Sequence, residues 1–292
     1  MEAITTKNLV SYFSNKKRLV VTLITFSTLL YLLTHLYIAR DLVYLFRPVF
    51  DRDVGLDFVE LPHFDNPSLN ASQLCAIHGW KKRPTSSPPV RIIDAAIFSI
   101  ELDLLELRLR ELWDVVDLFL VLEASRTFSG RPKALHLKAN LARFAWASEK
   151  LRLESLTSLT PLSLGQSPFA NEVMMRDGMT AMVKRFAAPG DLVFISDLDE
   201  IPRASTLGLF RQCTGYPLPI HLRMKTYFYS FQFYFPTNEA WRNKLIEYNP
   251  NNFTYAHAAK VSKFILADSG WHCTFCFRRL SGKGFGFGLM SS

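Results

Sequence analysis

Three carboxylates follow a short apolar run in the sequence GDLVFISDLDEIP, residues 190–202. The apolar residues 192–195 follow a Pro-Gly stop and predict a buried strand of a sheet that is covered on both faces. Asp197, Asp199 and Glu200 come directly after that strand. Like charges this close repel each other, and burying them unpaired is costly. We therefore expect these carboxylates to have a positively charged partner.

A divalent cation is one such partner. Mg²⁺ and Mn²⁺ prefer oxygen ligands, and often take one or two carboxylates together with substrate phosphates. A cation that bridges a diphosphate stabilises a leaving group that gains negative charge as its bond breaks. Asp197 and Asp199 therefore indicate a Mn²⁺ or Mg²⁺ site. The alternative is a solvated acidic turn that caps a helix opened by Pro202.

The elements around these carboxylates indicate an α/β body with a mostly parallel sheet. A strand–helix–strand unit favours parallel pairing of its two strands. In such sheets ligands bind beyond the carboxyl ends of the strands, where Glu123 and Asp197 both lie. The predicted elements are strands at 91–99, 115–123 and 192–196, with helices at 101–113, around 138–150 and around 171–187.

A run of aromatic residues occupies residues 224–236, MKTYFYSFQFYFP. Its period of two is typical of a strand that packs an aromatic face against the core or at a sheet edge. The alternative is a stacking platform for a sugar ring. The aromatic residues at every second position are Tyr227, Tyr229, Phe231, Phe233 and Phe235.

The N-terminal sequence predicts a single-pass membrane anchor. Residues 19–38 carry no formal charge, and a helix of that length spans about 30 Å, enough for a bilayer core. Lys16, Lys17 and Arg18 precede it, which leaves residues 1–18 in the cytosol and the body in the lumen. A cleaved signal peptide would end in a small-x-small site, which is not seen. Residues 39–90 are predicted to form a stem.

Charge and cysteine usage agree with that topology. The chain of 292 residues has a formal net charge of +8 but contains no nucleic-acid-binding motif, so we expect a membrane partner and no nucleic acid. Asn70 and Asn252 begin glycosylation sequons. Three disulfide pairings are possible, and a zinc site would need a second close pair that the sequence lacks. The four cysteines are Cys75, Cys213, Cys273 and Cys276.

Three stretches in order along the chain resemble glycosyltransferase family 17. They are residues 101–133, residues 174–202 and GWHCTFCF at 270–277. The resemblance implies a GT-A-like Rossmann-type sheet and transfer of GlcNAc from UDP-GlcNAc to a mannose of an N-glycan on glycoproteins. A β-1,4 product implies inversion. It also implies a type II protein of the Golgi or ER membrane with a lumenal catalytic domain.

The resemblance implies roles for further residues near the donor. Glu123 and Arg176 would lie near the donor pocket beside Asp197, with Glu101 and Asp103 close by. Glu101 and Asp103 could instead cap the helix that follows them. Arg176 could instead pair with a carboxylate on a helix surface.

The resemblance also implies that His272 completes the metal site with Asp197 and Asp199, although a histidine packed beside a tryptophan is an equal alternative. Inversion needs a general base near the acceptor hydroxyl. Glu200 and Asp268 are the two candidates.

The sequence departs from the family after residue 280. Residues 281–292 are rich in glycine and predict an irregular tail. We therefore expect a transferase domain at 91–280 that is C-terminally incomplete, and a catalytically inactive lumenal protein is the alternative function. A phosphatase with Asp197 as nucleophile is a further alternative.

Overall fold

The computed structural model describes residues 17–32, 57–160, 169–237 and 239–276. Residues 17–32 form a helix whose large apolar side chains are exposed. Among the described residues, no helix combines the length and the apolar character needed to cross a membrane. Residues 33–38 of the predicted anchor and the predicted tail at 281–292 lie outside the described residues.

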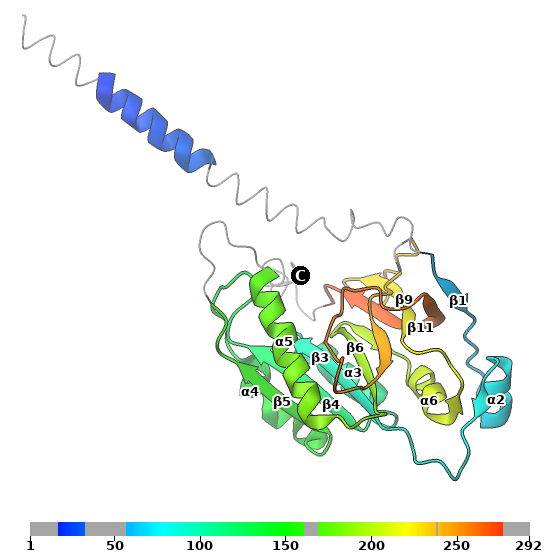
Figure 1. Cartoon of the computed structure of the whole chain (residues 1–292). Coiled ribbons are helices and arrows are strands. Elements are labelled where there is room, and N and C mark those ends of the chain that lie inside the picture. Colours follow the sequence, from blue (N-terminus) through cyan, green and yellow to red (C-terminus); the bar gives the residue numbers. More distant parts are fainter. Residues whose placement is uncertain (1–16, 33–56, 161–168, 238, 277–292) are drawn as a thin grey trace, which may run out of the picture. The chain divides into compact units, whose positions relative to one another are not determined.

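The body is built on one nine-stranded mixed sheet (Figure 1). The strand order is β1-β11-β9-β10-β6-β3-β4-β5, and β7 pairs with β11. Its strands are β1 (Val59–Leu61), β3 (Ile92–Phe98), β4 (Leu118–Ala124), β5 (Leu151–Leu156), β6 (Leu192–Asp197), β7 (Glu200–Pro202), β9 (Ile220–Phe228), β10 (Lys244–Glu247) and β11 (Phe264–Thr274). A separate two-stranded sheet is formed by β2 (Lys81–Lys82) and β8 (Cys213–Thr214). The helices are α2 (Ala71–Ile77), α3 (Leu102–Leu112), α4 (His136–Ala139), the 3₁₀ helix η1 (Leu141–Ala147), α5 (Phe169–Phe186) and α6 (Ala204–Gln212).

The predicted mostly parallel α/β sheet is confirmed. β6, β3, β4 and β5 are mutually parallel, and so are β1, β11 and β9. The exceptions are β10, which runs antiparallel to both of its neighbours, and β7, which runs antiparallel to β11. The carboxyl ends of β3, β4 and β6 therefore meet at one edge of the sheet.

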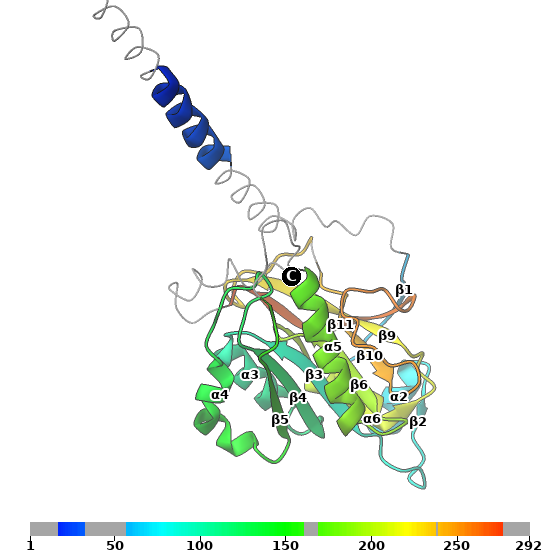
Figure 2. The ribbon, with the colours of Figure 1, turned by 60° about the vertical axis from the view of Figure 1, so that its left-hand side comes forward.

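Helices cover both faces of the parallel part of the sheet (Figure 2). Successive strand residues project to opposite faces, so the β4 side chains divide between two cores. Phe119 and Val121 pack in the core that contains Leu105 of α3. Leu120 packs in the other core, together with Met179 of α5. This double covering explains why β4 is buried along its whole length.

Two predicted elements differ from the structure. The predicted strand at 224–236 ends at Phe228, because the chain turns at Tyr229, which has a φ of 65°, and folds back. The predicted helix around 138–150 is the short α4 followed by the 3₁₀ helix η1, with Asn140 between them in a non-helical conformation. Periodicity locates apolar faces well, but it does not report where the chain reverses.

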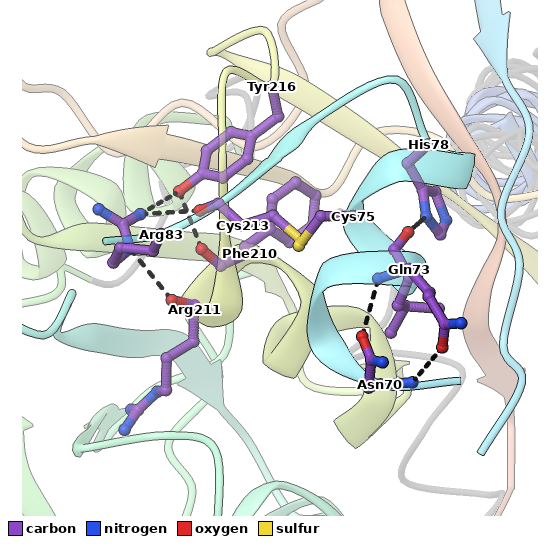
Figure 3. Close-up of a disulfide and its surroundings, with 10 residues drawn as sticks. Asn70, Gln73, Cys75, His78, Arg83, Phe210, Arg211, Cys213 and Tyr216 are labelled. Carbon is purple, nitrogen blue, oxygen red and sulfur yellow. Dashed lines mark hydrogen bonds between the residues drawn. A yellow bond between two sulfur atoms is a disulfide. The ribbon is translucent and has the colours of Figure 1, made fainter. Parts of the chain in front are cut away.

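The folded body begins before Arg91, the residue at which composition predicts its start. β1 pairs with β11, and a disulfide joins Cys75 of α2 to Cys213, which follows α6 (Figure 3). Figure 3 also shows the capping box that starts α2, in which the side chains of Asn70 and Gln73 each accept a hydrogen bond from the other residue's backbone N–H. Much of the predicted stem is therefore part of the domain.

Candidate active site

The carboxylates of the opening motif lie where β6 leaves the sheet. Asp197 is the last residue of β6, opposite Ile97 of β3, and Glu200 is the first residue of β7. Glu200 is 3% exposed, so the alternative of a solvated acidic turn is wrong for this residue. Pro202 ends a strand, and α6 begins only at Ala204. The carboxylates therefore lie at the short connection from β6 to β7, two strands that pair with different partners.

Two histidines from distant parts of the chain contact these carboxylates. His257 Nε2 lies 2.7 Å from Glu200 Oε2, and its Nδ1 lies 3.6 Å from Asp197 Oδ2. His272 Nε2 lies 3.3 Å from Asp199 Oδ2. β11 delivers His272 because it pairs with β7 and aligns this residue with Glu200. Each of the three carboxylates thus has an imidazole partner within the chain.

The electrostatics of this cluster favour protonated imidazoles. Burial lowers the pKa of His272, but the neighbouring Asp199 carboxylate outweighs it and raises the value to about 9. Burial also opposes the charge on His257, yet Asp197 and Glu200 together raise its pKa. Burial likewise raises the pKa of Glu200, but the charge and hydrogen bond of His257 lower it to about 2. The positive partner expected from the sequence is therefore supplied, at least in part, by histidine.

A buried arginine fixes the turn that carries the carboxylates. Arg108 of α3 is 1% exposed and donates two hydrogen bonds to Asp94 of β3, at 2.6 and 2.7 Å. Its Nη1 donates to the backbone carbonyls of Asp197, Leu198 and Glu200 at 3.0, 3.2 and 2.8 Å. One guanidinium thus links β3 to the turn after β6. This fork-shaped donor geometry is characteristic of arginine.

The segment that carries His257 is held in a similar way by Lys244 of β10. The Lys244 ammonium is almost fully buried and donates to the carbonyls of Ala256 and His257 at 2.6 and 2.8 Å. The Tyr255 hydroxyl donates to Ser196 O at 2.8 Å, next to the end of β6. These contacts set the distance between the His257 ring and the carboxylates.

Two of the residues predicted near the donor lie beside the cluster. The Glu101 carboxylate follows β3 and accepts hydrogen bonds from the backbone N–H groups of Ser99 and Ile100, and it makes no capping bond to α3. Burial raises its pKa, and the charge of Asp199 adds to the effect. Arg176 of α5 pairs with Glu172 on its own helix at 2.6 Å, as its alternative predicts. Burial lowers its pKa, but the nearby Asp197 charge contributes to raising it.

Glu123 and Asp103 make their contacts elsewhere. Glu123 is fully buried and accepts from the backbone N–H groups of Leu137 and Lys138, so it anchors α4. Asp103 pairs with Arg143 at 2.6 Å at the protein surface.

Asp268, one of the two candidate bases, lies on the opposite side of the β9–β11 pair from His272. Its carboxylate pairs with Lys225 at 2.9 Å and with Arg203 at 3.1 Å. Lys225 aligns with Trp271, and Thr226 aligns with His272. Because neighbouring residues of a strand project to opposite faces, Lys225 and its partner Asp268 are on the face away from His272.

The family model of glycosyltransferase family 17 matches residues 13–290. The chain belongs to glycosyltransferase family 17. This confirms the resemblance carried by the three sequence stretches.

Relatives of this family 17 chain agree with that assignment. The rat and human proteins named beta-1,4-mannosyl-glycoprotein 4-beta-N-acetylglucosaminyltransferase are each 27% identical to it over 185 residues, or 60% of this chain. The match covers 34% of those proteins, so the chain spans about a third of the length of the curated relatives it matches. A mannosyltransferase from Pyrobaculum calidifontis, solved with GDP-Man and Mn²⁺, aligns over 49% of this chain and 39% of its own at 17% identity, with a TM-score of 0.29.

The predicted metal ligands of the family 17 chain are only partly assembled. Within the ranges that the structure describes, no three His, Cys, Asp or Glu side chains are grouped so as to hold a metal ion. Asp199 and His272 approach each other closely, whereas Asp197 pairs with His257. A carboxylate and a neutral imidazole fit Mn²⁺ as part of a ligand set, because a bound cation would displace the proton from His272 and such ions commonly take their remaining ligands from phosphates and water. The CxxC sequence beside His272 is a disulfide, Cys273–Cys276, and is not a zinc site.

The sequence prediction of the site does not include Arg108 or His257, and only Arg108 has a signal in the sequence. Arg108 falls on the apolar face of α3, between Leu104 and Leu112, and an arginine in that position signals a buried acidic partner. His257 has no comparable signal, because residues 249–263 contain no periodic pattern, and the sequon at Asn252 does not point to a histidine. Only the folded chain brings it to the carboxylates.

Proposed function

We propose that this chain transfers GlcNAc from UDP-GlcNAc to a mannose of an N-glycan on glycoproteins, forming a β-1,4 linkage with inversion. Membership of family 17 and the names of its relatives support this reaction class. The observation that carries it is the Asp199–His272 pair beside Asp197, at the carboxyl edge of a parallel sheet. Ligands of α/β sheets bind at that edge.

The donor diphosphate would lie against this edge. Asp199 and His272 would hold Mn²⁺ or Mg²⁺, and the cation would neutralise charge that develops on the departing diphosphate. Arg176, whose charge is close to Asp197, would add a fixed positive charge on the α5 side. The GT-A-like character of the sheet belongs to the same proposal, since it is inferred from this edge and the family.

Neither predicted base has a geometry that suits proton abstraction. Glu200 is buried and hydrogen-bonded to His257. Burial raises its pKa, but the charge of His257 has the larger effect and lowers the pKa to about 2. A carboxylate of such low pKa is a weak base. Asp268 is paired with Arg203 and Lys225 on the face of the β9–β11 pair that is turned away from His272. Both assignments stay predictions.

We further propose that the protein is a type II membrane protein of the Golgi or ER with a lumenal body. The uncharged sequence at 19–38, the preceding basic residues and the two disulfides support this topology. Asn70 and Asn252 are both exposed and are available for glycosylation in the lumen. Endoglycosidase should increase the gel mobility of the expressed protein, and sealed microsomes should protect the body from protease. An unshifted band with a protease-sensitive body would contradict this topology.

The donor site is tested with Asp199→Asn, which keeps the side-chain volume and removes one charge. UDP binding by the wild-type chain should require Mn²⁺ or Mg²⁺ and should be lost in EDTA. Asp199→Asn should weaken metal-dependent UDP binding by at least about tenfold, because Lewis-acid contacts are worth several kcal/mol. Asp177→Asn, a matched change at an exposed residue of α5, should leave UDP binding unchanged.

The outcomes separate the alternatives. UDP binding that is indifferent to both EDTA and Asp199→Asn would overturn the metal-dependent donor site. UDP binding without GlcNAc transfer to a glycan would favour the catalytically inactive alternative. Hydrolysis of a phosphate ester that Asp197→Asn abolishes would instead identify a phosphatase.

A further inference from the structure

An exposed aromatic hairpin begins at the end of β9. We call residues 226–235 the aromatic ribbon. Phe228 N donates to Phe233 O at 3.0 Å, and Phe235 N donates to Thr226 O at 2.8 Å, so the ribbon folds back along β9. Exposed groups of large apolar side chains mark interaction sites. The exposed fractions are Tyr229 49%, Phe231 42%, Phe233 62%, Tyr234 44% and Phe235 43%.

The aromatic ribbon has two different faces. Residues directly opposite each other in an antiparallel pair project to the same face. Thr226 is therefore on the same face as Phe235, and Phe228 is on the same face as Phe233. The Phe228 and Phe235 rings meet edge to face at 5.4 Å, which unites these residues in one face. Tyr227 and Tyr234 pair on the other face, with ring centroids 5.5 Å apart.

Only the face that includes Phe235 is continuous with the candidate active site. Its first residue, Thr226, is aligned with His272 across the parallel β9–β11 pair. The Thr226 hydroxyl lies 3.4 Å from His272 Nδ1, and His272 Nε2 contacts Asp199. Thr226 and the His272 imidazole therefore connect this face to the Asp199 carboxylate.

The sheet order separates this face from the other flank of the site. β9 and β11 lie on one side of β6, whereas β3 and β4 lie on the other. Glu101, which follows β3, belongs to that second flank. Two flanks of one carboxylate cluster suit two substrates, a donor on one side and an acceptor on the other.

We propose that Phe228, Phe233 and Phe235 bind the acceptor glycan by stacking against the face of a pyranose ring. The inference rests on the proposed transferase function. One face of a hexopyranose presents C–H groups, while its hydroxyls lie around the edge. Stacking on an aromatic ring removes both apolar surfaces from water and leaves those hydroxyls hydrated. The four residues of this face carry no charge, which fits a neutral sugar better than a diphosphate.

The chain offers a matched pair of variants for the test. Phe235 and Phe231 are 43% and 42% exposed, but Phe231 contacts Tyr227 on the other face, with ring centroids 5.6 Å apart. The full chain is titrated with the free trimannosyl–chitobiose core of N-glycans, and binding is followed by ligand-observed NMR. Phe235→Ala should weaken glycan binding roughly tenfold, and Phe231→Ala should change it less than about twofold. Phe235→Trp should restore it.

UDP binding by the same proteins distinguishes this inference from the proposed function. Both alanine variants should bind UDP with Mn²⁺ as the wild type does. Equal glycan binding by the two alanine variants, or no glycan binding by the wild type, would overturn the ribbon as an acceptor site. A loss of UDP affinity in Phe235→Ala would assign the ring to the nucleobase and would also overturn it. Binding of phosphatidylcholine vesicles that both variants reduce equally would identify a membrane contact instead.

A wild-type chain that binds no UDP, with glycan binding lost only in Phe235→Ala, would refute the donor chemistry and leave the glycan site in place.

Discussion

Replacing Arg108 by methionine should destabilise the protein and disturb the carboxylate turn together. The change keeps an apolar stem but removes six hydrogen bonds, to the Asp94 carboxylate, the Ser196 hydroxyl and three backbone carbonyls. Asp94 is 2% exposed, so its charge would be left buried without a partner. Breaking a buried ion pair from one side typically costs 3–5 kcal/mol. We expect the free energy of unfolding to fall by about 4 kcal/mol.

Urea denaturation at neutral pH measures this loss. Arg110→Met is the matched control, because Arg110 pairs with Glu106 on the exposed side of the same helix with 60% of its side chain exposed. Exposed pairs of this kind contribute about 0.3–0.5 kcal/mol. The control should therefore leave the urea midpoint almost unchanged.

A double variant separates stability from site geometry. Arg108→Met combined with Asp94→Leu removes the stranded charge, and most of the lost stability should return. The carbonyls of Asp197, Leu198 and Glu200 remain without their donor, so metal-dependent UDP binding should stay weak. Arg108 would therefore affect UDP binding by holding the carboxylate turn in place. A loss below about 1 kcal/mol in Arg108→Met, or full recovery of UDP affinity in the double variant, would refute the reasoning.

Three further outcomes follow from other parts of the fold. His221 donates through Nδ1 and accepts through Nε2, and burial lowers its pKa from 6.5 to about 4. As the pH falls, this histidine is protonated in the unfolded chain before it is protonated in the folded chain. The free energy of unfolding should therefore fall by about 2–3 kcal/mol between pH 6.5 and 4. His221→Gln should reduce that loss in pH-dependent thermal melts. Replacing Cys75 and Cys213 by alanine should cost about 2–4 kcal/mol in urea denaturation, because the disulfide closes a separation of 138 residues. Gly270→Ala should lower the melting temperature by several degrees, because the new Cβ would lie 2.3 Å from a backbone oxygen of β7, whereas Gly208→Ala meets only a 3.7 Å contact and should not.

The sequence predicts the fold wherever one local pattern decides it. The unit from β3 through α3 to β4 has a continuous apolar strand, an amphipathic helix and another apolar strand, so its type and pairing follow from periodicity. The same patterns fail at residues 224–236, because alternation in a strand and in the hairpin that folds back on it look alike. The pairing of Phe228 with Phe233 depends on where the chain reverses, which the alternation does not indicate.

The candidate site shows a similar division. Asp197, Asp199 and Glu200 stand out because three acids end an apolar strand, and this position alone indicates a ligand edge. Their partner His257 does not stand out, because it reaches them only when Lys244 and Tyr255 fix the segment after β10. Charge repulsion in the sequence predicts that a counter-charge exists, but the identity of that counter-charge depends on long-range packing.

His272 is the residue on which both proposals meet. Its Nε2 contacts Asp199 on the donor flank, and its Nδ1 is 3.4 Å from Thr226, where the face of the aromatic ribbon begins. The parallel β9–β11 pair fixes the second contact, and the antiparallel β7–β11 pair aligns His272 with Glu200 beside Asp199. A single strand therefore sets the distance between the proposed donor carboxylates and the proposed acceptor platform. Transfer between two bound sugars needs such a fixed separation, because correct positioning of reactants supplies much of the rate enhancement.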